Sequence, residues 1–375
     1  MKIAIDARGI NWYEGTGIGT YTENVLKNLI DIDQKNKYHI YWSLDKYEPF
    51  IKDNTKILMT SKKHHRFFQD YYFPYNLQQE NVDLYHIPQN GIGLNPNIKC
   101  KKIVTIHDLI PYIMPETVGK GYLLKFLKEM PNIIENADGI ITVSEYSKKD
   151  ILRFFPIDEK KIFVTPLAAD KKYKPLDKEK CKLILKEKYN INKPFILYLG
   201  GFSERKNVHG LIKAFAKIYD KLDKEYFLVI VGSYKDQSQA LIKLRDNLNM
   251  ENKIIFTGYA EDEDLPIYYN GCEIFVYPSL YEGFGLPPLE AMNCKTPVIT
   301  SNRTSIPEVV QDGGVLIDPN NIEQLSDSIG NLLSNESLRL YYGEQGYKIS
   351  QNYSWKSTAK KTLEAYETVY STLTL

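Results

Sequence analysis

The sequence predicts an α/β protein made of two doubly wound domains. Two series of short apolar segments alternate with helical or loop segments, and a polar, lysine-rich stretch over 170–193 separates the series. With 375 residues, the chain is also too long for one ordinary hydrophobic core. Alternating strands and helices favour parallel sheets covered by helices on both faces, and ligands of such sheets bind beyond the carboxyl ends of the strands.

Short apolar runs mark the expected strands. The first series comprises Lys2–Asp6, Tyr38–Trp42, Leu84–Ile87, Lys102–Ile106 and Gly139–Val143. The second series comprises Phe195–Leu199, Phe227–Val231, Lys253–Phe256, Ile274–Tyr277 and Pro297–Thr300. Helices are expected from about Tyr21 to Ile30, from about His209, and from about Trp355 to Leu373.

Composition excludes several classes of protein. The 48 basic residues nearly balance the 47 acidic ones, so no strong positive field suggests a nucleic-acid partner. The four cysteines (Cys100, Cys181, Cys272 and Cys294) are far apart and form no CxxC pair, which favours a reducing cytoplasm over a zinc site or a disulfide scaffold. The first ten residues are too short and too charged for a signal peptide, and no run of about eighteen apolar residues predicts a membrane span.

The segment Tyr277–Met292 is the most informative part of the chain. It places two carboxylates, Glu282 and Glu290, around a glycine-flanked loop that opens into a helix with two prolines in its first turn. The amides of Phe284, Gly285 and Leu286 would face the crevice, and a helix N-terminus favours negative charge there. The alternative is an ordinary surface loop followed by a helix.

This segment, which reads EGFGLPPLEAM from Glu282, resembles the donor site of the GT4 family (glycosyl transferase group 1) of retaining nucleotide-sugar glycosyltransferases. The resemblance implies the GT-B fold, with two facing Rossmann-like domains and an interdomain cleft. It implies that Glu282 lies against the donor sugar, that Glu290 binds the ribose hydroxyls, and that Gly283, Phe284, Gly285 and Leu286 also contact the donor. It covers most of the chain and implies an acceptor domain over 1–175, a donor domain over 190–350, and a C-terminal helix over 355–375 that crosses back.

Two adjacent cations, Arg205 and Lys206, follow a strand in the second series. Cleavage of a sugar from a nucleotide diphosphate builds negative charge on the departing phosphate, which cations stabilise. Their segment, GGFSERKN over 200–207, is similar to the family's glycine-rich loop that holds the diphosphate. Many relatives carry the arginine nearer the first glycine, so the match is weaker for Arg205 than for Lys206. A solvated basic pair at a helix start is the alternative.

Three further segments contribute candidate residues. His107 follows a strand in TIHDLIP and resembles the family's HDLxP histidine, which approaches the donor sugar; a structural histidine is the alternative. Gly17 and Gly19 look like the family's N-terminal glycine loop, whose amides approach the donor phosphate or the acceptor, although a flexible connection would also explain them. Gly258 and Tyr259 occupy the position where relatives bind the nucleotide base through the backbone.

Acidic pairs elsewhere do not predict a metal site. Asp31 and Asp33 follow a helix and precede a strand, at the wrong end of the sheet. The run Glu261–Asp264 lies before a helix and is expected to cap it. The basic and aromatic segment Lys62–Tyr75 could touch an anionic membrane, or its rings could pack between structural elements.

Together these features predict a metal-independent, cytoplasmic hexosyltransferase without a cofactor. The overall pattern resembles bacterial polysaccharide mannosyltransferases that use GDP-mannose and extend a glycan or lipid-linked acceptor. Peripheral contact with the inner face of the membrane is a further expectation. Two alternatives remain: a GT-B epimerase of nucleotide sugars, and a catalytically silent sugar-nucleotide-binding partner in polysaccharide assembly.

Overall fold

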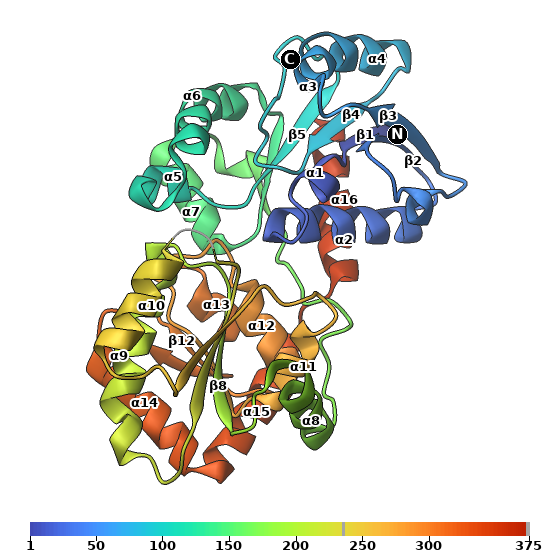
Figure 1. Cartoon of the computed structure of the whole chain (residues 1–375). Coiled ribbons are helices and arrows are strands. Elements are labelled where there is room, and N and C mark those ends of the chain that lie inside the picture. The colour runs from blue at the N-terminus through green and yellow to red at the C-terminus, as the bar shows by residue number, and fades with distance from the viewer. Residues whose placement is uncertain (235–236, 373–375) are drawn as a thin grey trace. The chain divides into compact units, whose positions relative to one another are not determined.

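The protein forms two compact units (Figure 1). The computed structural model describes residues 1–234 and 237–372. The first unit contains Met1–Leu167 and the C-terminal segment from Ser354 onward, and the second contains Ala168–Tyr353. No helix in the described residues is long and apolar enough to cross a bilayer.

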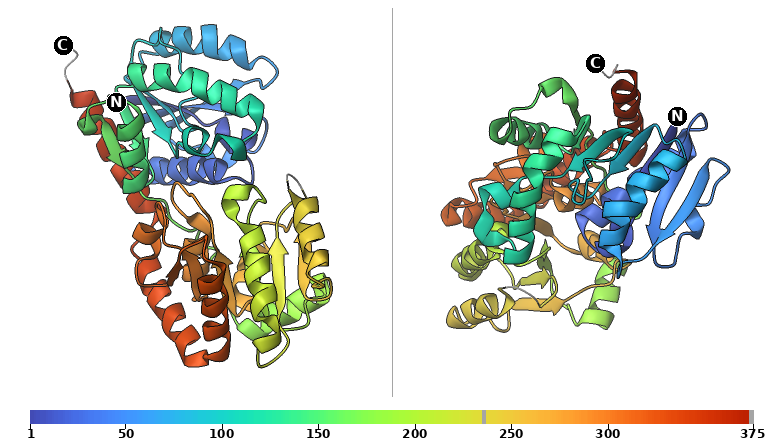
Figure 2. Two further views of the ribbon diagram at one scale, coloured as in Figure 1. Left: turned by 90° about the vertical axis from the view of Figure 1, so that its left-hand side faces the viewer. Right: turned by 90° about the horizontal axis from the view of Figure 1, so that it is seen from above.

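The first unit contains a seven-stranded parallel sheet with the order β3-β2-β1-β4-β5-β6-β7. Its strands are β1 (Lys2–Asp6), β2 (Lys37–Ser43), β3 (Thr55–Thr60), β4 (Leu84–Ile87), β5 (Lys101–Ile106), β6 (Gly139–Thr142) and β7 (Ile162–Val164). Central strands such as β4 are buried along their whole length, because helices cover both faces of the sheet (Figure 2).

The helices of the first unit are α1 (Gly9–Trp12), α2 (Gly17–Ile32), α3 (His65–Phe67), the π-helix η2 (Phe68–Tyr72), α4 (Phe73–Gln79), α5 (Ile110–Ile113), α6 (Lys120–Asn136), α7 (Glu145–Phe154) and α16 (Trp355–Ser371). The C-terminal helix α16, red in Figure 1, packs against α2 and against β5, β6 and β7. The chain therefore returns to its first unit, with Tyr366 fully buried there.

The second unit contains a six-stranded parallel sheet with the order β10-β9-β8-β11-β12-β13. Its strands are β8 (Phe195–Leu199), β9 (Phe227–Val231), β10 (Ile254–Gly258), β11 (Ile274–Tyr277), β12 (Val298–Ser301) and β13 (Val315–Ile317). Its helices are α8 (Lys178–Tyr189), α9 (Val208–Ile218), α10 (Ser238–Asn247), α11 (Leu265–Gly271), α12 (Leu286–Asn293), α13 (Ile306–Val310), α14 (Ile322–Ser334) and α15 (Glu336–Ser350).

The predicted α/β class with two doubly wound parallel sheets is confirmed. Strands β3, β7 and β13 are not predicted by the sequence pattern, and each is the outermost strand at an edge of its sheet. Two of these strands, Ile162–Val164 and Val315–Ile317, are only three residues long, and β3 is half-buried with polar ends. An edge strand lacks the continuous apolar run that identifies a buried central strand.

The boundary between the units lies earlier than the predicted end of the first domain at residue 175. Residues 168–175 pack with the second unit instead. Lys172 forms an ion pair with Asp262, and the ring of Tyr173 packs against that of Tyr269. The lysine-rich composition of this stretch separates the two series of strands in the sequence, but it does not reveal these contacts. The C-terminal end of the last predicted helix, Leu373, lies outside the described residues.

Each sheet reverses its winding direction at one point, and there the loops after two neighbouring strands part to opposite sides. In the first unit this switch point lies between β1 and β4, and in the second it lies between β8 and β11. Ligands of open α/β sheets bind at such a crevice, beyond the carboxyl ends of the strands. The loop after β8 carries Arg205 and Lys206, and the loop after β11 carries Glu282.

Gly232 fixes the course of the loop after β8. A Cβ atom at this position would lie 2.2 Å from the carbonyl oxygen of Gly200 and 2.9 Å from ring atoms of Phe202. We expect Gly232→Ala to lower the free energy of unfolding by about 1–3 kcal/mol, the usual cost of overpacking. The matched control is Gly201→Ala, because nothing lies within 4 Å of a Cβ atom there. Equal urea-unfolding midpoints for the two variants would contradict this account.

Candidate functional site

The loops after β8 and β11 are joined by their backbones. The amide of Leu280 donates a hydrogen bond to the carbonyl oxygen of Arg205 at 2.7 Å, and the Ser279 hydroxyl donates to the same oxygen at 3.1 Å. Arg205 and Lys206 lie in the 3-10 helix η5 (Glu204–Lys206). The two motifs that the sequence placed about seventy residues apart therefore form one site at the switch point.

Glu282 lies at the centre of this site. Its Oε1 accepts hydrogen bonds from Lys206 Nζ at 2.6 Å, from Arg205 Nη1 at 3.0 Å, from Tyr277 Oη at 3.0 Å and from Ser279 Oγ. The exposed fractions of the Arg205, Lys206 and Glu282 side chains are 18%, 12% and 11%. The structure thus brings together three of the four residues to which the sequence assigned catalysis.

The cations control the ionisation of Glu282. Burial alone would raise its pKa, but the charges of Arg205 and Lys206, with hydrogen bonds from Lys206 and Ser279, lower the pKa to about 2. Glu282 is therefore a carboxylate across the physiological range. Its negative charge is paired with two cations, Arg205 and Lys206.

The loop that carries Glu282 is braced by the loop after β12. The Thr304 hydroxyl accepts a hydrogen bond from the Glu282 amide at 3.2 Å, and the Ser305 hydroxyl donates to the carbonyl oxygens of Glu282 and Phe284. Gly285 precedes α12 with a φ of 112°, which other residues rarely adopt, and a Cβ atom there would lie 2.6 Å from Ile306. Both prolines lie in the first turn of α12, as the sequence predicted.

Glu290, on α12, has the opposite electrostatic environment. It is 8% exposed, and its Oε2 accepts a hydrogen bond from Tyr269 Oη at 2.9 Å. Burial raises the pKa of Glu290 to about 8, and the bond from Tyr269 only partly opposes this shift. Within the described part of the chain, no basic group forms an ion pair with Glu290. Its carboxyl group is therefore mainly protonated at neutral pH.

At the end of β10, part of the backbone already takes part in hydrogen bonds within the protein. Gly258 has a φ of 76°, and its carbonyl oxygen accepts hydrogen bonds from the Gly232 amide and the Thr257 hydroxyl. The ring of Tyr234 packs against Gly258, since a Cβ atom there would lie 2.9 Å from it. Tyr259, by contrast, is 65% exposed.

His107 lies in the first unit, directly after β5. Its Nε2 lies 2.9 Å from the carbonyl oxygen of Pro88, and its ring packs edge-on against Tyr21 at 4.8 Å. Because a carbonyl can only accept, the proton must lie on Nε2, which leaves Nδ1 unprotonated. Burial lowers the pKa of His107 to about 4, against the opposing effect of the Pro88 bond. The ring is therefore neutral at pH 7.

Gly17 and Gly19 lie in the first turn of α2, so the helix begins earlier than the sequence predicted. The Gly19 amide donates to the side chain of Thr16, which caps the helix. A Cβ atom at Gly19 would lie 2.4 Å from the carbonyl oxygen of Tyr13, whereas Gly17 has open space. Close packing against Tyr13 thus explains why position 19 is a glycine, and the Gly19 amide already donates a hydrogen bond to Thr16.

The acidic pairs are satisfied by other groups. Asp33 accepts a hydrogen bond from Tyr38 Oη at 2.6 Å, and Asp31 forms an ion pair with Lys52 at 3.2 Å. Asp264 precedes α11, but its side chain makes no cap bond, so that part of the capping prediction was wrong: it bonds Lys188 and Tyr189 instead. Among the described residues, no three His, Cys, Asp or Glu side chains are grouped to hold a metal ion.

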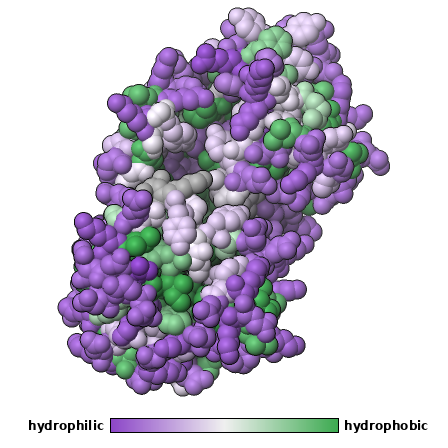
Figure 3. Space-filling view, viewed as in Figure 1, coloured by the Kyte–Doolittle hydropathy of each residue, from purple (hydrophilic) through white to green (hydrophobic). Residues whose placement is uncertain are grey.

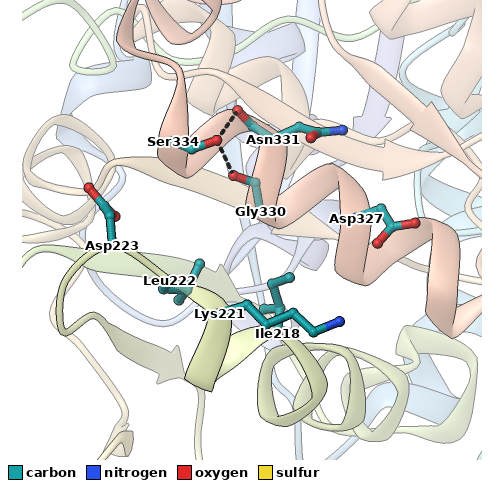
Figure 4. Close-up of a pocket in the computed structure, with 8 residues that line it drawn as sticks. All are labelled: Ile218, Lys221, Leu222, Asp223, Asp327, Gly330, Asn331 and Ser334. Atoms are coloured by element: carbon teal, nitrogen blue, oxygen red, sulfur yellow. Dashed lines mark hydrogen bonds between the residues drawn. The ribbon is translucent and has the colours of Figure 1, made fainter.

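A hollow of about 490 Å³ lies elsewhere in the second unit, between α9 and α14 (Figure 4). Helix α9 runs back from the carboxyl edge of the sheet, so this hollow lies at the edge opposite Glu282. Asp223, Asp327 and Lys221 line this hollow. The Ser334 hydroxyl, also in its lining, donates hydrogen bonds to backbone carbonyls of its own helix. It lacks the converging donors of the Glu282 site.

Sequence reasoning missed three polar side chains of the site. Tyr277 and Ser279 flank the strand-to-loop turn and bond Glu282, and Tyr269 bonds Glu290 from α11. Tyr277 was assigned to a buried apolar strand, and nothing in a strand pattern shows that a phenol hydroxyl has a charged partner. The position of Tyr277 at the carboxyl end of β11 was the available signal.

Comparison with known proteins identifies the class. Over 182–349 the chain matches the family model for glycosyl transferases group 1, and over 15–173 it matches the model for glycosyltransferase family 4. Two solved structures share the fold: sucrose-phosphate synthase from Thermosynechococcus elongatus (TM-score 0.78, 18% identity, 100% of both chains) and Anabaena HepE, solved with UDP and glucose (TM-score 0.76, 17% identity, 98% of this chain and 100% of that one). The protein is therefore a glycosyltransferase with the GT-B fold.

A relative at higher identity places it within that class. The chain is 30% identical to the O-antigen chain mannosyltransferase B of Escherichia coli, over 98% of this chain and 100% of that protein. The chain belongs to the GT4 family of glycosyltransferases.

The protonated state of Glu290 predicts a pH-dependent stability. The folded-state pKa of Glu290, about 8, exceeds the ordinary value of 4.5. The contribution of Glu290 to the free energy of unfolding is therefore fully present below pH 4.5 and is lost as the pH rises through 8. We expect Glu290→Gln, which cannot ionise, to remove this loss, on the order of a few kcal/mol. Urea unfolding of both proteins at pH 5.5 and pH 8.5 checks this, and parallel pH dependences would contradict it.

Proposed function

We propose that this protein is a retaining, metal-independent mannosyltransferase that uses GDP-mannose to extend a glycan or lipid-linked acceptor in cell-surface polysaccharide synthesis. The observation that carries the proposal is the convergence of Arg205 and Lys206 on Glu282 at a switch point. The full-length similarity to a protein named O-antigen chain mannosyltransferase B supports the choice of mannose and of a polysaccharide acceptor. Similarity to HepE supports a nucleoside-diphosphate sugar as the class of donor.

The proposed reaction requires stabilisation of a departing diphosphate. As the bond between the sugar's anomeric carbon and the phosphate oxygen breaks, its electron pair stays on that oxygen, and Arg205 and Lys206 stabilise the charge. An acceptor oxygen attacks the anomeric carbon from the same face, and its proton passes to the departing phosphate. Because two cations already serve the diphosphate, the proposal needs no metal ion.

The remaining residues position the donor. Glu282, held as a carboxylate, lies against the sugar in this proposal, and Glu290 accepts hydrogen bonds from the ribose hydroxyls. The backbone at Tyr259 contacts the base, and the neutral ring of His107 lines the reacting centre. A neutral imidazole with an unprotonated Nδ1 can accept a hydrogen bond from a sugar hydroxyl. Because the ring is uncharged, it does not attract the phosphate away from Arg205 and Lys206.

We also propose that the first unit contacts the inner face of an anionic membrane. In the Lys62–Tyr75 segment, Phe68, Tyr72 and Phe73 pack against the core, but Phe67, Tyr71 and Tyr75 are 55%, 70% and 64% exposed. Hydrophobic side chains lie among hydrophilic ones over α3 and α4 (Figure 3). The exposed bases Lys62, Lys63 and Arg66 adjoin these rings. Exposed aromatic rings beside cations suit an anionic interface, where a lipid-linked acceptor would lie.

The donor proposal is tested by turnover. We would screen GDP-mannose, UDP-glucose and related donors for thermal stabilisation, then follow donor consumption with and without acceptor. Lys206→Ala should lower kcat by about 100-fold or more, because it removes a charge that acts on the leaving group. The control is Lys217→Ala, an exposed lysine that pairs with Glu323. Unchanged turnover in Lys206→Ala would remove the phosphate role, and isomerised donor without acceptor would indicate an epimerase.

The membrane proposal is tested by flotation with vesicles that contain phosphatidylglycerol or only phosphatidylcholine. We expect binding to the anionic vesicles alone, and at least about a 10-fold loss in the double variant Phe67→Ser/Tyr71→Ser, which removes two exposed rings. The matched control replaces Leu183 and Ile184 of α8, which are 55% and 39% exposed, with serine. Equal loss in both double variants would show that the α3 surface has no special role.

A further inference from the structure

Tyr277 makes several contacts with the charged cluster around Glu282, although it is 1% exposed. Lys206 Nζ donates a hydrogen bond to Tyr277 Oη and lies 4.9 Å from the centroid of the Tyr277 ring. The same hydroxyl donates its own proton to Glu282 Oε1 at 3.0 Å. The phenol oxygen therefore bridges the ammonium group of Lys206 and the carboxylate of Glu282.

The Tyr277 ring is itself held rigidly. It lies at the end of β11, between the ring of Tyr198 at 6.1 Å and an interplanar angle of 14°, and that of Phe275 at 5.9 Å and 20°. Tyr198 in turn donates a hydrogen bond to the carbonyl oxygen of Gly201 at 2.7 Å, in the loop that leads to Lys206. The stacked rings thus hold Tyr277, the hydrogen-bond partner of Lys206, in a fixed position at the end of a β-strand.

A lysine side chain has a flexible four-carbon stem. The position of its ammonium group therefore depends on the groups that the ammonium contacts. A charge that is preorganised where negative charge develops stabilises a transition state without reorganisation. Lys206 has such contacts through Tyr277, and Glu282 receives a second bond from the same hydroxyl. Loss of that hydroxyl would loosen both members of the ion pair.

We infer that Tyr277 is a positioning residue, whose hydroxyl holds Lys206 where the departing phosphate of a nucleotide sugar gains its charge. The inference rests on the proposed function of the Glu282 site. Tyr277 does not touch the substrate in this role and acts only through Lys206 and Glu282. The role goes beyond the residues that the sequence motifs indicate, since the sequence placed Tyr277 in an apolar strand.

The test is a double-mutant cycle in kcat/KM with Tyr277→Phe and Lys206→Met. Tyr277→Phe keeps the ring and its stacking, so the protein should fold, which thermal unfolding would verify. Alone, it should lower kcat by about 10-fold while the donor KM changes less, because the hydroxyl serves an interaction made mainly in the transition state. In the Lys206→Met background, Tyr277→Phe should lower kcat/KM by a clearly smaller factor than it does alone, because only its bond to Glu282 is then lost.

The control is Tyr226→Phe, a buried tyrosine of the same unit whose hydroxyl bonds the carbonyl oxygen of Leu333 far from Glu282. It should leave kcat/KM unchanged. If Tyr277→Phe matches the wild type, or if its loss multiplies with that of Lys206→Met, the inference is overturned while the transferase function stands. A wild-type protein that consumes no nucleotide sugar would overturn the proposed function and this role together.

Discussion

The ion pairs between Glu282 and the two cations Arg205 and Lys206 join the loops after β8 and β11. All three side chains are largely buried, so each charge would be costly without the others. Removing one partner of a buried pair usually costs about 3–5 kcal/mol, because it leaves an uncompensated charge. The topology brings these partners together: β8 and β11 are neighbours at the switch point, although about seventy residues separate their loops.

Two glutamates of one short segment differ in protonation because their surroundings differ. Glu282 faces two cations and has a pKa lowered to about 2, whereas Glu290 is buried beside Tyr269 and has a pKa raised to about 8. One residue therefore contributes a permanent negative charge, and the other contributes a carboxyl group that can both donate and accept hydrogen bonds. Eight positions along the chain separate them, and the turn into α12 places them in separate environments.

The fold class and the loop positions of Arg205, Lys206 and Glu282 could be predicted from the sequence, because they depend on local patterns. Central strands are continuous apolar runs, and the glycines and prolines around Glu282 specify a loop and a helix start. What could not be predicted depends on contacts between distant segments. The sequence placed Lys206 and Glu282 in different roles but did not show that they bond each other, or that Tyr277 bonds both. It also placed Gly19 in an open loop, whereas the structure places it under a helix cap.

The decisive experiment is a crystal structure of the protein with GDP, because it shows whether Arg205 and Lys206 bind a nucleoside diphosphate. We expect phosphate oxygens within hydrogen-bond distance of the Lys206 ammonium and the Arg205 guanidinium, with the carboxylate of Glu282 sharing those cations. A diphosphate bound elsewhere on the protein, while both cations remain engaged by Glu282 alone, would contradict it.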